Sequence, residues 1–202
     1  MKVIGITGGV GSGKSEVLKF LGSRERVVVC QSDEVAKLLQ KKGTKCFNDI
    51  VEHFGDSIVA EDGELNRKVL AEVVFHDKGE LDALNRIVHP AVEGYIRNWI
   101  CEEKEKKTEL FFLETALLIE TKYDELFCDE VWYIHASDDV RMKRLKYSRG
   151  YSEEKIKAIF RSQKTKEEYM NSCDRVIDNS RSFEETAVQL LHILDKISQE
   201  NK

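Results

Sequence analysis

A glycine-rich segment near the N-terminus constrains this chain more than any other feature of its sequence. Residues 8–15 read Gly-Gly-Val-Gly-Ser-Gly-Lys-Ser and match the pattern G-x-x-x-x-G-K-[ST] at every position. The apolar residues 3–6 precede the segment, and Val17, Leu18 and Leu21 follow it at helical spacing. A strand, a glycine turn and a helix in this order are the context that a phosphate-binding loop requires. The segment therefore predicts a nucleoside triphosphate site rather than an ordinary turn before a helix.

The residue types in this loop suit the binding of phosphate. Glycine lets backbone N–H groups approach phosphate oxygens, and the following helix presents free N–H groups and the positive end of its dipole. We expect Lys14 to neutralise the transferring phosphate and the hydroxyl of Ser15 to ligate Mg²⁺. The candidate nucleotide-binding residues of the loop are Gly8, Gly9, Gly11, Ser12, Gly13, Lys14, Ser15 and Glu16.

Charge and cysteine content argue against several other classes of protein. The 202 residues include 32 basic and 37 acidic side chains, for a net charge of -5, whereas a general nucleic-acid binder is usually basic. Five cysteines without a C-x-x-C pair and five histidines without metal-ligand spacing predict reduced thiols and no zinc site. The chain opens on a strand pattern rather than a signal peptide, and it lacks an apolar run of the roughly 20 residues that cross a bilayer. We expect a cytoplasmic single-domain protein, a monomer or weak homo-oligomer, with no nucleic-acid or membrane partner.

Apolar runs alternate with helical patterns along the chain, which predicts a parallel sheet with helices on both faces. Ligands of such sheets gather at the carboxyl ends of the strands. Asp33 and Glu114 each follow the end of an apolar run, so both are expected at that edge. The expected strands beside residues 3–6 are residues 27–30, 110–113, 130–134 and 175–177.

Each of these two acids has a functional and a structural interpretation. Asp33 could deprotonate an acceptor hydroxyl or hold Mg²⁺ through water, or it could simply be a carboxylate at a helix N-terminus. Glu114 could position Mg²⁺ in the way of a Walker B acid, although aspartate is commoner there, or it could be an ordinary acid at a strand end.

Residues 43–107 show helical patterns without a convincing strand and predict a helical insert between the second and third strands. Pro90 is the only proline of the chain and is expected to kink the long last helix or divide it near His89. Arg67 follows a polar turn and could bind an anionic substrate group or cap a helix. For His89 the residues themselves favour a buried, hydrogen-bonded side chain over a catalytic one.

Five basic residues fall between Arg141 and Arg149. The planar guanidinium of arginine donates two hydrogen bonds to phosphate at once, so Arg144 and Arg149 are the candidate phosphate clamps of a closing lid. Lys143 and Lys146 are better explained as a solvated helix face that pairs with the acidic residues 138 and 139.

An ordered set of further motifs accompanies the loop, namely Phe54-Gly55, Asp62-Gly63-Glu64-Leu65-Asn66-Arg67, Val74-Phe75, His89-Pro90, Leu117-Leu118-Ile119-Glu120, Gln163 and Asp174-Arg175-Val176-Ile177-Asp178-Asn179. With these motifs the chain resembles the dephospho-CoA kinase family over nearly its full length. The chain departs from the family pattern at Gln31-Ser32, where an acid is usual, at Ala116, where proline is usual, and at Glu16, where threonine is common. Asp33 keeps the position of the family's catalytic aspartate.

The resemblance implies ATP-dependent phosphorylation of the ribose 3′-hydroxyl of dephospho-CoA, with Mg²⁺, to give CoA and ADP. It implies a three-layer P-loop kinase fold, in which Asn179 joins the nucleotide site while Arg67, His89 and Asp33 face the acceptor. The alternatives are another small-metabolite kinase on the same core or a nucleotide-dependent switch, although the Asn-Lys-x-Asp segment of guanine-binding switches is absent. The implied parts are a nucleotide-binding core of residues 1–42, 108–147 and 173–202, an acceptor-binding insert of residues 43–107 and a lid of residues 148–172.

Overall fold

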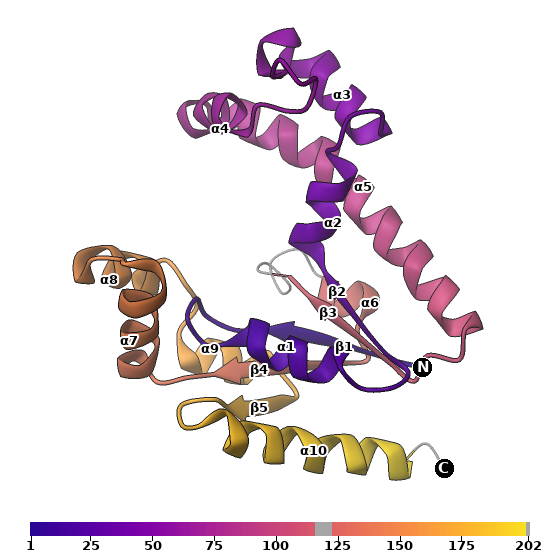
Figure 1. Ribbon diagram of the computed structural model, residues 1–202, viewed down its shortest axis with the longest axis vertical. Coiled ribbons are helices and arrows are strands. Elements are labelled where there is room, and N and C mark those ends of the chain that lie inside the picture. Colours follow the sequence, from indigo (N-terminus) through magenta and orange to yellow (C-terminus); the bar gives the residue numbers. More distant parts are fainter. Residues whose placement is uncertain (116–122, 201–202) are drawn as a thin grey trace. The chain divides into compact units, whose positions relative to one another are not determined.

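The computed structural model describes residues 1–115 and 123–200 of the chain (Figure 1). Ala116 and the family motif of residues 117–120 lie outside the described residues. By its internal contacts the chain divides into two compact units, the first of residues 1–29 and 107–202 and the second of residues 30–106.

A five-stranded sheet with the order β2-β3-β1-β4-β5 forms the centre of the fold. β1 pairs in parallel with both β3 and β4, and β4 pairs in parallel with β5. The predicted α/β fold class, a parallel sheet flanked by helices, is therefore confirmed. The strands are β1 (Lys2–Thr7), β2 (Val27–Gln31), β3 (Leu110–Glu114), β4 (Glu130–His135) and β5 (Arg175–Asp178).

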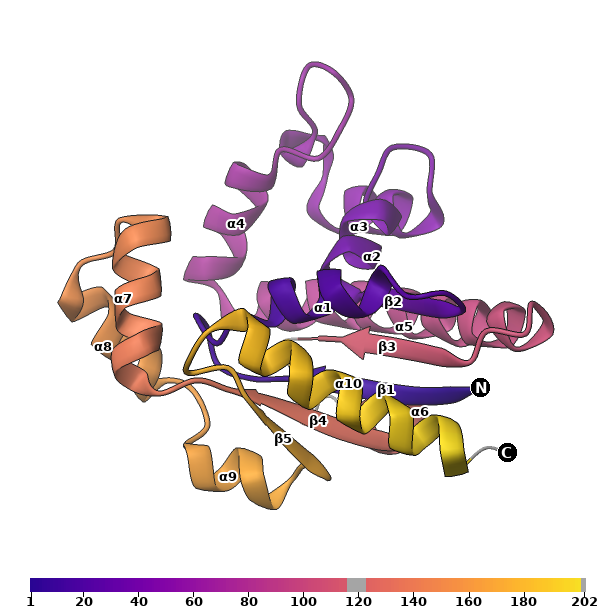
Figure 2. The same ribbon diagram turned by 60° about the horizontal axis from the view of Figure 1, so that its bottom comes forward.

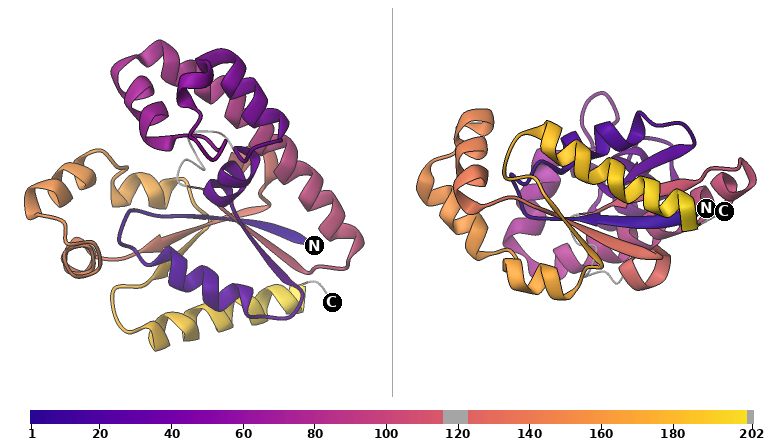
Figure 3. Two further views of the ribbon diagram at one scale, coloured as in Figure 1. Left: turned by 45° about the horizontal axis from the view of Figure 1, so that its top comes forward. Right: turned by 90° about the horizontal axis from the view of Figure 1, so that it is seen from below.

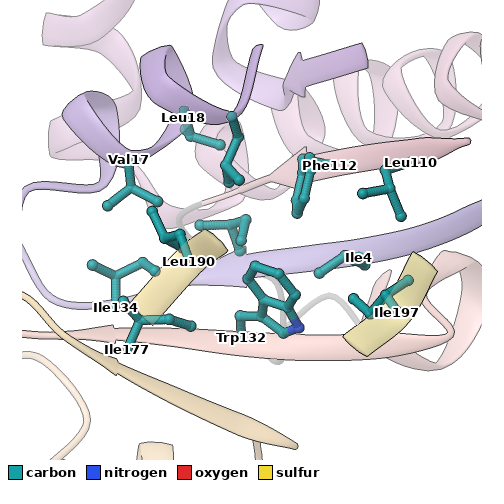
Figure 4. Close-up of a cluster of buried hydrophobic side chains, with 12 residues drawn as sticks. Ile4, Val17, Leu18, Leu110, Phe112, Trp132, Ile134, Ile177, Leu190 and Ile197 are labelled. Carbon is teal, nitrogen blue, oxygen red and sulfur yellow. The ribbon is translucent and has the colours of Figure 1, made fainter. Parts of the chain in front are cut away.

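Helices cover both faces of this sheet, as Figures 2 and 3 show. On one face, the side chains of α1 and α10 pack against alternate residues of β1, β3, β4 and β5 in a single apolar cluster (Figure 4). On the other face, the ring of Tyr133 in β4 stacks on that of Tyr169 in α9, with centroids 4.7 Å apart. Burial on both faces explains why the strands read as continuous apolar runs instead of alternating ones. The helices of this unit are α1 (Lys14–Gly22), α6 (Tyr123–Phe127), α7 (Asp138–Arg149), α8 (Glu153–Arg161), α9 (Lys166–Asn171) and α10 (Phe183–Glu200).

A buried carboxylate joins the start of β4 to its neighbours. Glu130 accepts hydrogen bonds from Lys2, Trp132 and Arg175, which belong to β1, β4 and β5. Burial alone would raise the pKa of Glu130, but these hydrogen bonds outweigh that effect and lower it. Glu130 is therefore charged at neutral pH and ties three strands together at the end remote from the glycine loop.

The second unit is helical, and its long helix α5 packs against α2, α3 and α4. The predicted insert of residues 43–107 lies in this unit except for residue 107, and the unit also includes α2 and the end of β2. Thr44, Asn66 and Asp77 cap α3, α4 and α5 by accepting hydrogen bonds from backbone N–H groups. The elements of this unit are α2 (Ser32–Leu39), α3 (Lys45–Phe54), the 3-10 turn η1 (Asp56–Ile58), α4 (Arg67–His76) and α5 (Lys78–Glu105).

Pro90 does not divide α5, contrary to one of the two expectations from sequence. The helix runs unbroken from Lys78 to Glu105 with Pro90 inside it. Proline removes one backbone donor, but the turns on either side keep theirs, and the buried side chains of Val88, Val92 and Ile96 hold the helix on both sides of the interruption. Among the described residues, no helix is long and apolar enough to cross a membrane.

Candidate phosphate-binding site

The glycine loop joins β1 to α1 and lies in the first unit. Gly13 is the N-cap of α1 and has a φ of 91°, in the left-handed region that favours glycine. The loop closes on itself through a hydrogen bond from Ser12 N to Gly9 O of 3.1 Å. Lys14 begins the helix, and its ammonium group donates to Gly8 O at 2.7 Å. The predicted strand–loop–helix unit is thus present, with the helix N-terminus at the end of the loop.

Protein atoms occupy the space beside these glycines. A Cβ on Gly13 would collide with Nδ2 of Asn179, and a Cβ on Gly8 would lie 2.5 Å from the carbonyl oxygen of Ile134. A Cβ on Gly11 would lie 3.1 Å from Cγ of Leu145. The close approach of phosphate is one reason for glycine at these positions, and it is the reason that the sequence suggests. The structure adds a second reason, because β4, α7 and the end of β5 press against the loop.

Two side chains from distant segments converge on the carbonyl group of Ser12. Nδ2 of Asn179 donates to Ser12 O at 2.8 Å, and Nη1 of Arg144 donates to the same oxygen at 3.1 Å. The second guanidinium nitrogen of Arg144 donates to Asn179 O at 3.0 Å. Arg144 in α7 therefore bridges the loop and the segment after β5.

Asn179 is fully buried and its orientation is set by its neighbours. Its backbone N–H donates to His135 O at 2.7 Å, and its Oδ1 accepts from the hydroxyl of Thr186 at 2.8 Å. With Oδ1 occupied in this way, the amide NH₂ is directed at the loop. The structure therefore brings Asn179 and Arg144 together with the loop.

Residues that could hold a cation lie beside the strand before the loop and in the helix turn after it. Glu114 ends β3 and is paired in register with Ile6 of β1, two residues before Gly8, and it is half-buried. Ser15 and Glu16 are exposed in the first turn of α1. Within the described ranges, no three histidine, cysteine, aspartate or glutamate side chains are grouped as a protein-only metal site. Mg²⁺ needs no such group, because it is commonly held by one or two protein oxygens together with water and phosphate.

Arg149, the second candidate phosphate clamp, is placed differently from Arg144. Arg149 is the last residue of α7, and its guanidinium carbon lies 5.9 Å from the ring centroid of Tyr151 on an exposed surface. Lys146 pairs with Glu153 at 2.9 Å rather than with an acid at the start of α7. The acid there, Asp138, pairs instead with Arg141, so the predicted partners of Lys146 are wrong.

Three candidate residues belong to the second unit. Asp33 is exposed in the first turn of α2, two residues after the last residue of β2. Arg67 begins α4, where its guanidinium donates to Oε1 of Gln40 at 3.1 Å. His89 is exposed on α5, so the expected buried histidine is wrong. Residue 89 falls on the solvent side of the helix, whereas the adjacent Val88 points into the core.

Sequence reasoning missed two residues that contact the loop directly. Arg141 in α7 and Gln163 after α8 form hydrogen bonds to both backbone groups of Val10. Arg141 was one member of the basic cluster and Gln163 one of the matching family residues, but neither was assigned a role. Their separation from the loop in sequence, 131 and 153 positions, conceals the contact from any local pattern.

Comparisons with known proteins agree with this geometry. The family model described as dephospho-CoA kinase matches residues 2–185. A dephospho-CoA kinase of Carboxydothermus hydrogenoformans is 35% identical over 97% of this chain and 94% of its own length. One from Dehalococcoides mccartyi is 37% identical over 95% of this chain and 96% of its own length.

Solved structures show the same fold. A protein from Thermus thermophilus aligns with a TM-score of 0.77 and 30% identity, covering 96% of this chain and 97% of its own. The dephospho-CoA kinase from Campylobacter jejuni aligns over the whole of both chains with a TM-score of 0.74 and 23% identity. The chain therefore belongs to the dephospho-CoA kinase family, and its reaction is the ATP-dependent phosphorylation of dephospho-CoA, the final step of coenzyme A biosynthesis.

Proposed function

We propose that the chain transfers the γ-phosphoryl group of ATP to the 3′-hydroxyl of the ribose of dephospho-CoA. The loop of residues 8–16 and Asn179 hold the nucleotide, and Lys14 neutralises charge on the transferring phosphate. One observation carries this assignment. The hydroxyl of Ser12, inside the loop, is buried without a hydrogen-bond partner among the residues that the structure describes. A bound phosphate oxygen is an acceptor that would satisfy such a group.

Arg144 stabilises the negative charge that builds up during transfer. Its guanidinium is already bonded to the carbonyl oxygens of Ser12 in the loop and of Asn179 after β5, so little reorganisation is needed when phosphate binds. Arg149 acts as the second clamp and closes over the phosphates from its exposed place at the end of α7. Arg144 thus shapes the site, and Arg149 closes it.

Mg²⁺ accompanies ATP and is held by the hydroxyl of Ser15 and by Glu114. The two residues suit this ion, because a loop hydroxyl and a carboxylate at a neighbouring strand end are both hard oxygen donors. When bound, the ion neutralises phosphate charge.

The second unit supplies the acceptor side. Asp33 accepts the proton of the 3′-hydroxyl as its oxygen forms a bond to the γ-phosphorus and the bond from that phosphorus to the β–γ bridging oxygen breaks. The exposure of Asp33 suits such a role, because a base must reach the substrate oxygen directly. Arg67 binds an anionic group of dephospho-CoA, and His89 contacts the same substrate. The helical insert of residues 43–107 thereby selects the acceptor.

A panel of acceptors tests this proposal. Purified enzyme is given Mg²⁺-ATP with dephospho-CoA, adenosine, a nucleoside monophosphate or shikimate, and ADP release is followed with mass analysis of the product. Dephospho-CoA should be preferred by at least about tenfold in kcat/KM, with a single phosphate gained at the ribose. Faster turnover of another acceptor would make the chain a different metabolite kinase, and ATP hydrolysis without any acceptor would favour a nucleotide-dependent switch.

The remaining expectations concern the state of the protein in the cell. We propose a cytoplasmic enzyme that acts as a monomer or weak homo-oligomer on small-molecule substrates. Light scattering over a range of protein concentrations tests the oligomeric state, and a fluorescent fusion tests the location.

A further inference from the structure

Side chains from distant parts of the chain hold both backbone groups of Val10, in the middle of the phosphate loop. Val10 N donates to Oε1 of Gln163 at 3.2 Å, and Val10 O accepts from Nε of Arg141 at 3.0 Å. Nη2 of Arg141 also donates to Oε1 of Gln163, at 2.6 Å. The three residues form a closed ring of hydrogen bonds, which we call the Val10 clamp.

The arginine of the clamp is itself held rigidly. Its side chain is only 12% exposed, and its remaining nitrogen Nη1 donates to Asp138 at 2.9 Å. The guanidinium carbon lies 4.0 Å from the ring centroid of Phe160, the distance of a cation–π contact. All three nitrogens of the guanidinium are therefore engaged, and its plane rests on a ring from α8. A group fixed in this way transmits the position of α7 and α8 to the loop.

The neighbouring glycine provides a second, independent observation. A Cβ on Gly9 would lie 2.5 Å from Nη2 of Arg141 and 3.1 Å from Oε1 of Gln163. Gly9 is not among the glycines with positive φ, so its backbone conformation does not itself call for glycine. The absence of a side chain at residue 9 thus makes room for the clamp.

We propose that Gln163 and Arg141 are positioning residues of the kinase reaction. They commit the Val10 N–H to a protein acceptor and so fix the loop in the shape that receives the phosphates of ATP. Gln163 lies between α8 and α9, within the predicted lid of residues 148–172, so this segment supports the nucleotide site even before any closure. The inference rests on the proposed role of the loop in binding ATP.

Substitution of Gln163 separates the clamp from simple packing. Gln163→Leu keeps most of the side-chain volume but removes the oxygen that accepts from Val10 and Arg141. A misplaced loop should lower kcat/KM for ATP by about 10–100-fold, the scale of loss from a shift of about 1 Å in a reacting group. Gln163→Glu keeps an oxygen for both donors and should stay within about threefold of the wild type.

The measurements are the affinity for a non-hydrolysable ATP analogue, the single-turnover rate at saturating ATP, and the thermal midpoint. Ser162→Ala is the matched control, because the hydroxyl of Ser162 donates to the carbonyl of Ile159 and not to the loop. Gly9→Ala should cause a loss similar to that of Gln163→Leu. The double variant should lose little more than either single variant, because both disturb one unit. Gln163→Asn, which keeps the amide but shortens its reach, replaces the leucine variant if that variant does not fold.

Wild-type nucleotide affinity and transfer rate in Gln163→Leu would overturn the proposal. It would also fail if Gln163→Glu were as impaired as Gln163→Leu, since the accepting oxygen would then not matter. These results are distinct from failure of the proposed reaction, because analogue affinity is measured without any acceptor. A wild-type enzyme that binds the analogue but does not phosphorylate dephospho-CoA would refute the reaction alone.

Discussion

The two units of the chain carry their candidate residues in contrasting ways. In the first unit, the phosphate loop is enclosed by Asn179, Arg144, Arg141 and Gln163, each hydrogen-bonded to a loop backbone group. In the second unit, Asp33, Arg67 and His89 are exposed. Hydrogen bonds to the loop hold the side chains of the first set in place, whereas the side chains of the second set are open to solvent.

This difference matches what each substrate requires. Phosphoryl transfer depends on the precise placement of phosphate groups and charges, so a rigid cradle lowers the barrier. An acceptor as long as dephospho-CoA must enter and leave, and exposed residues allow this. Variants of the cradle should therefore affect catalysis and folding together, while variants of the second unit should affect the acceptor with little change in stability.

The largest effect is expected from Lys14→Ala. Removing the charge from the loop should lower kcat/KM by roughly 10³–10⁵-fold, the range for a charge-stabilising residue in phosphoryl transfer. The fold should persist, because Lys14 begins α1 and alanine favours a helix. Steady-state assays with circular dichroism test this, with the exposed Lys19 of the same helix as the matched control. Near-normal turnover of Lys14→Ala would show that the loop is not the ATP site.

Asp33→Asn should come next and should act on the acceptor alone. The amide keeps the size but loses the proton-accepting charge, so kcat should fall by roughly 10²–10⁴-fold. Nucleotide affinity and the thermal midpoint should stay close to wild type, because Asp33 is exposed. A single-turnover assay and calorimetric titration of Mg²⁺-ATP distinguish the outcomes. A large loss of Mg²⁺-ATP affinity would instead make Asp33 a metal-site residue. If the rate of phosphoryl transfer were unchanged, Asp33 would not be the base, and Glu114 would be the next candidate for that role.

Arg144 and Arg149, the two candidate phosphate clamps, provide a comparison within the first unit. Arg144→Ala should lower kcat by about 10²–10³-fold and also reduce thermal stability, since it leaves the carbonyl groups of Ser12 and Asn179 with one donor fewer. Arg149→Ala should lower kcat less and leave stability unchanged. Equal losses of stability in both variants would contradict the distinction between a shaping and a closing arginine. If both variants only raised the KM for ATP, neither arginine would act on the transition state.

The smallest effect is expected from Arg67→Ala. Loss of one charged contact should weaken dephospho-CoA binding by about tenfold, equivalent to about 1.4 kcal/mol, and leave ATP binding intact. The exposed Lys68 is the neighbouring control. Calorimetric titrations with each ligand test the prediction, and equal losses for both ligands would argue against acceptor selection by the second unit.

Much of this fold was predictable because its signals are local. The strands and the phosphate loop follow from neighbouring residues, and the structure contains both. Arg144 could be selected because a guanidinium suits phosphate, whereas Asn179 was selected only through the family resemblance. The caps of α3 and α8 are also local, because Thr44 and Ser152 each accept a hydrogen bond from the backbone N–H three residues later.

The remaining features depend on packing that no local pattern contains. The contacts of Arg141 and Gln163 with Val10 exist only because α7 and the segment after α8 fold back onto the loop. Pro90 was expected to disturb its helix more than it does, because the packing of α5 was not visible in the sequence. The exposure of His89 likewise depends on which face of α5 packs against α2, α3 and α4.

The hydrogen bond between Asn179 and Ser12 has a consequence for synthesis of the protein. It joins residues 167 positions apart, so the loop leaves the ribosome long before Asn179 does. Contacts this distant close late in folding, after their intervening segments have emerged. A nascent chain that ends at α7 has the glycine loop without Asn179, Thr186 and Gln163. ATP should therefore stabilise the finished chain but not its early fragments. Added ATP should slow proteolysis of the finished chain and should not slow proteolysis of truncated products.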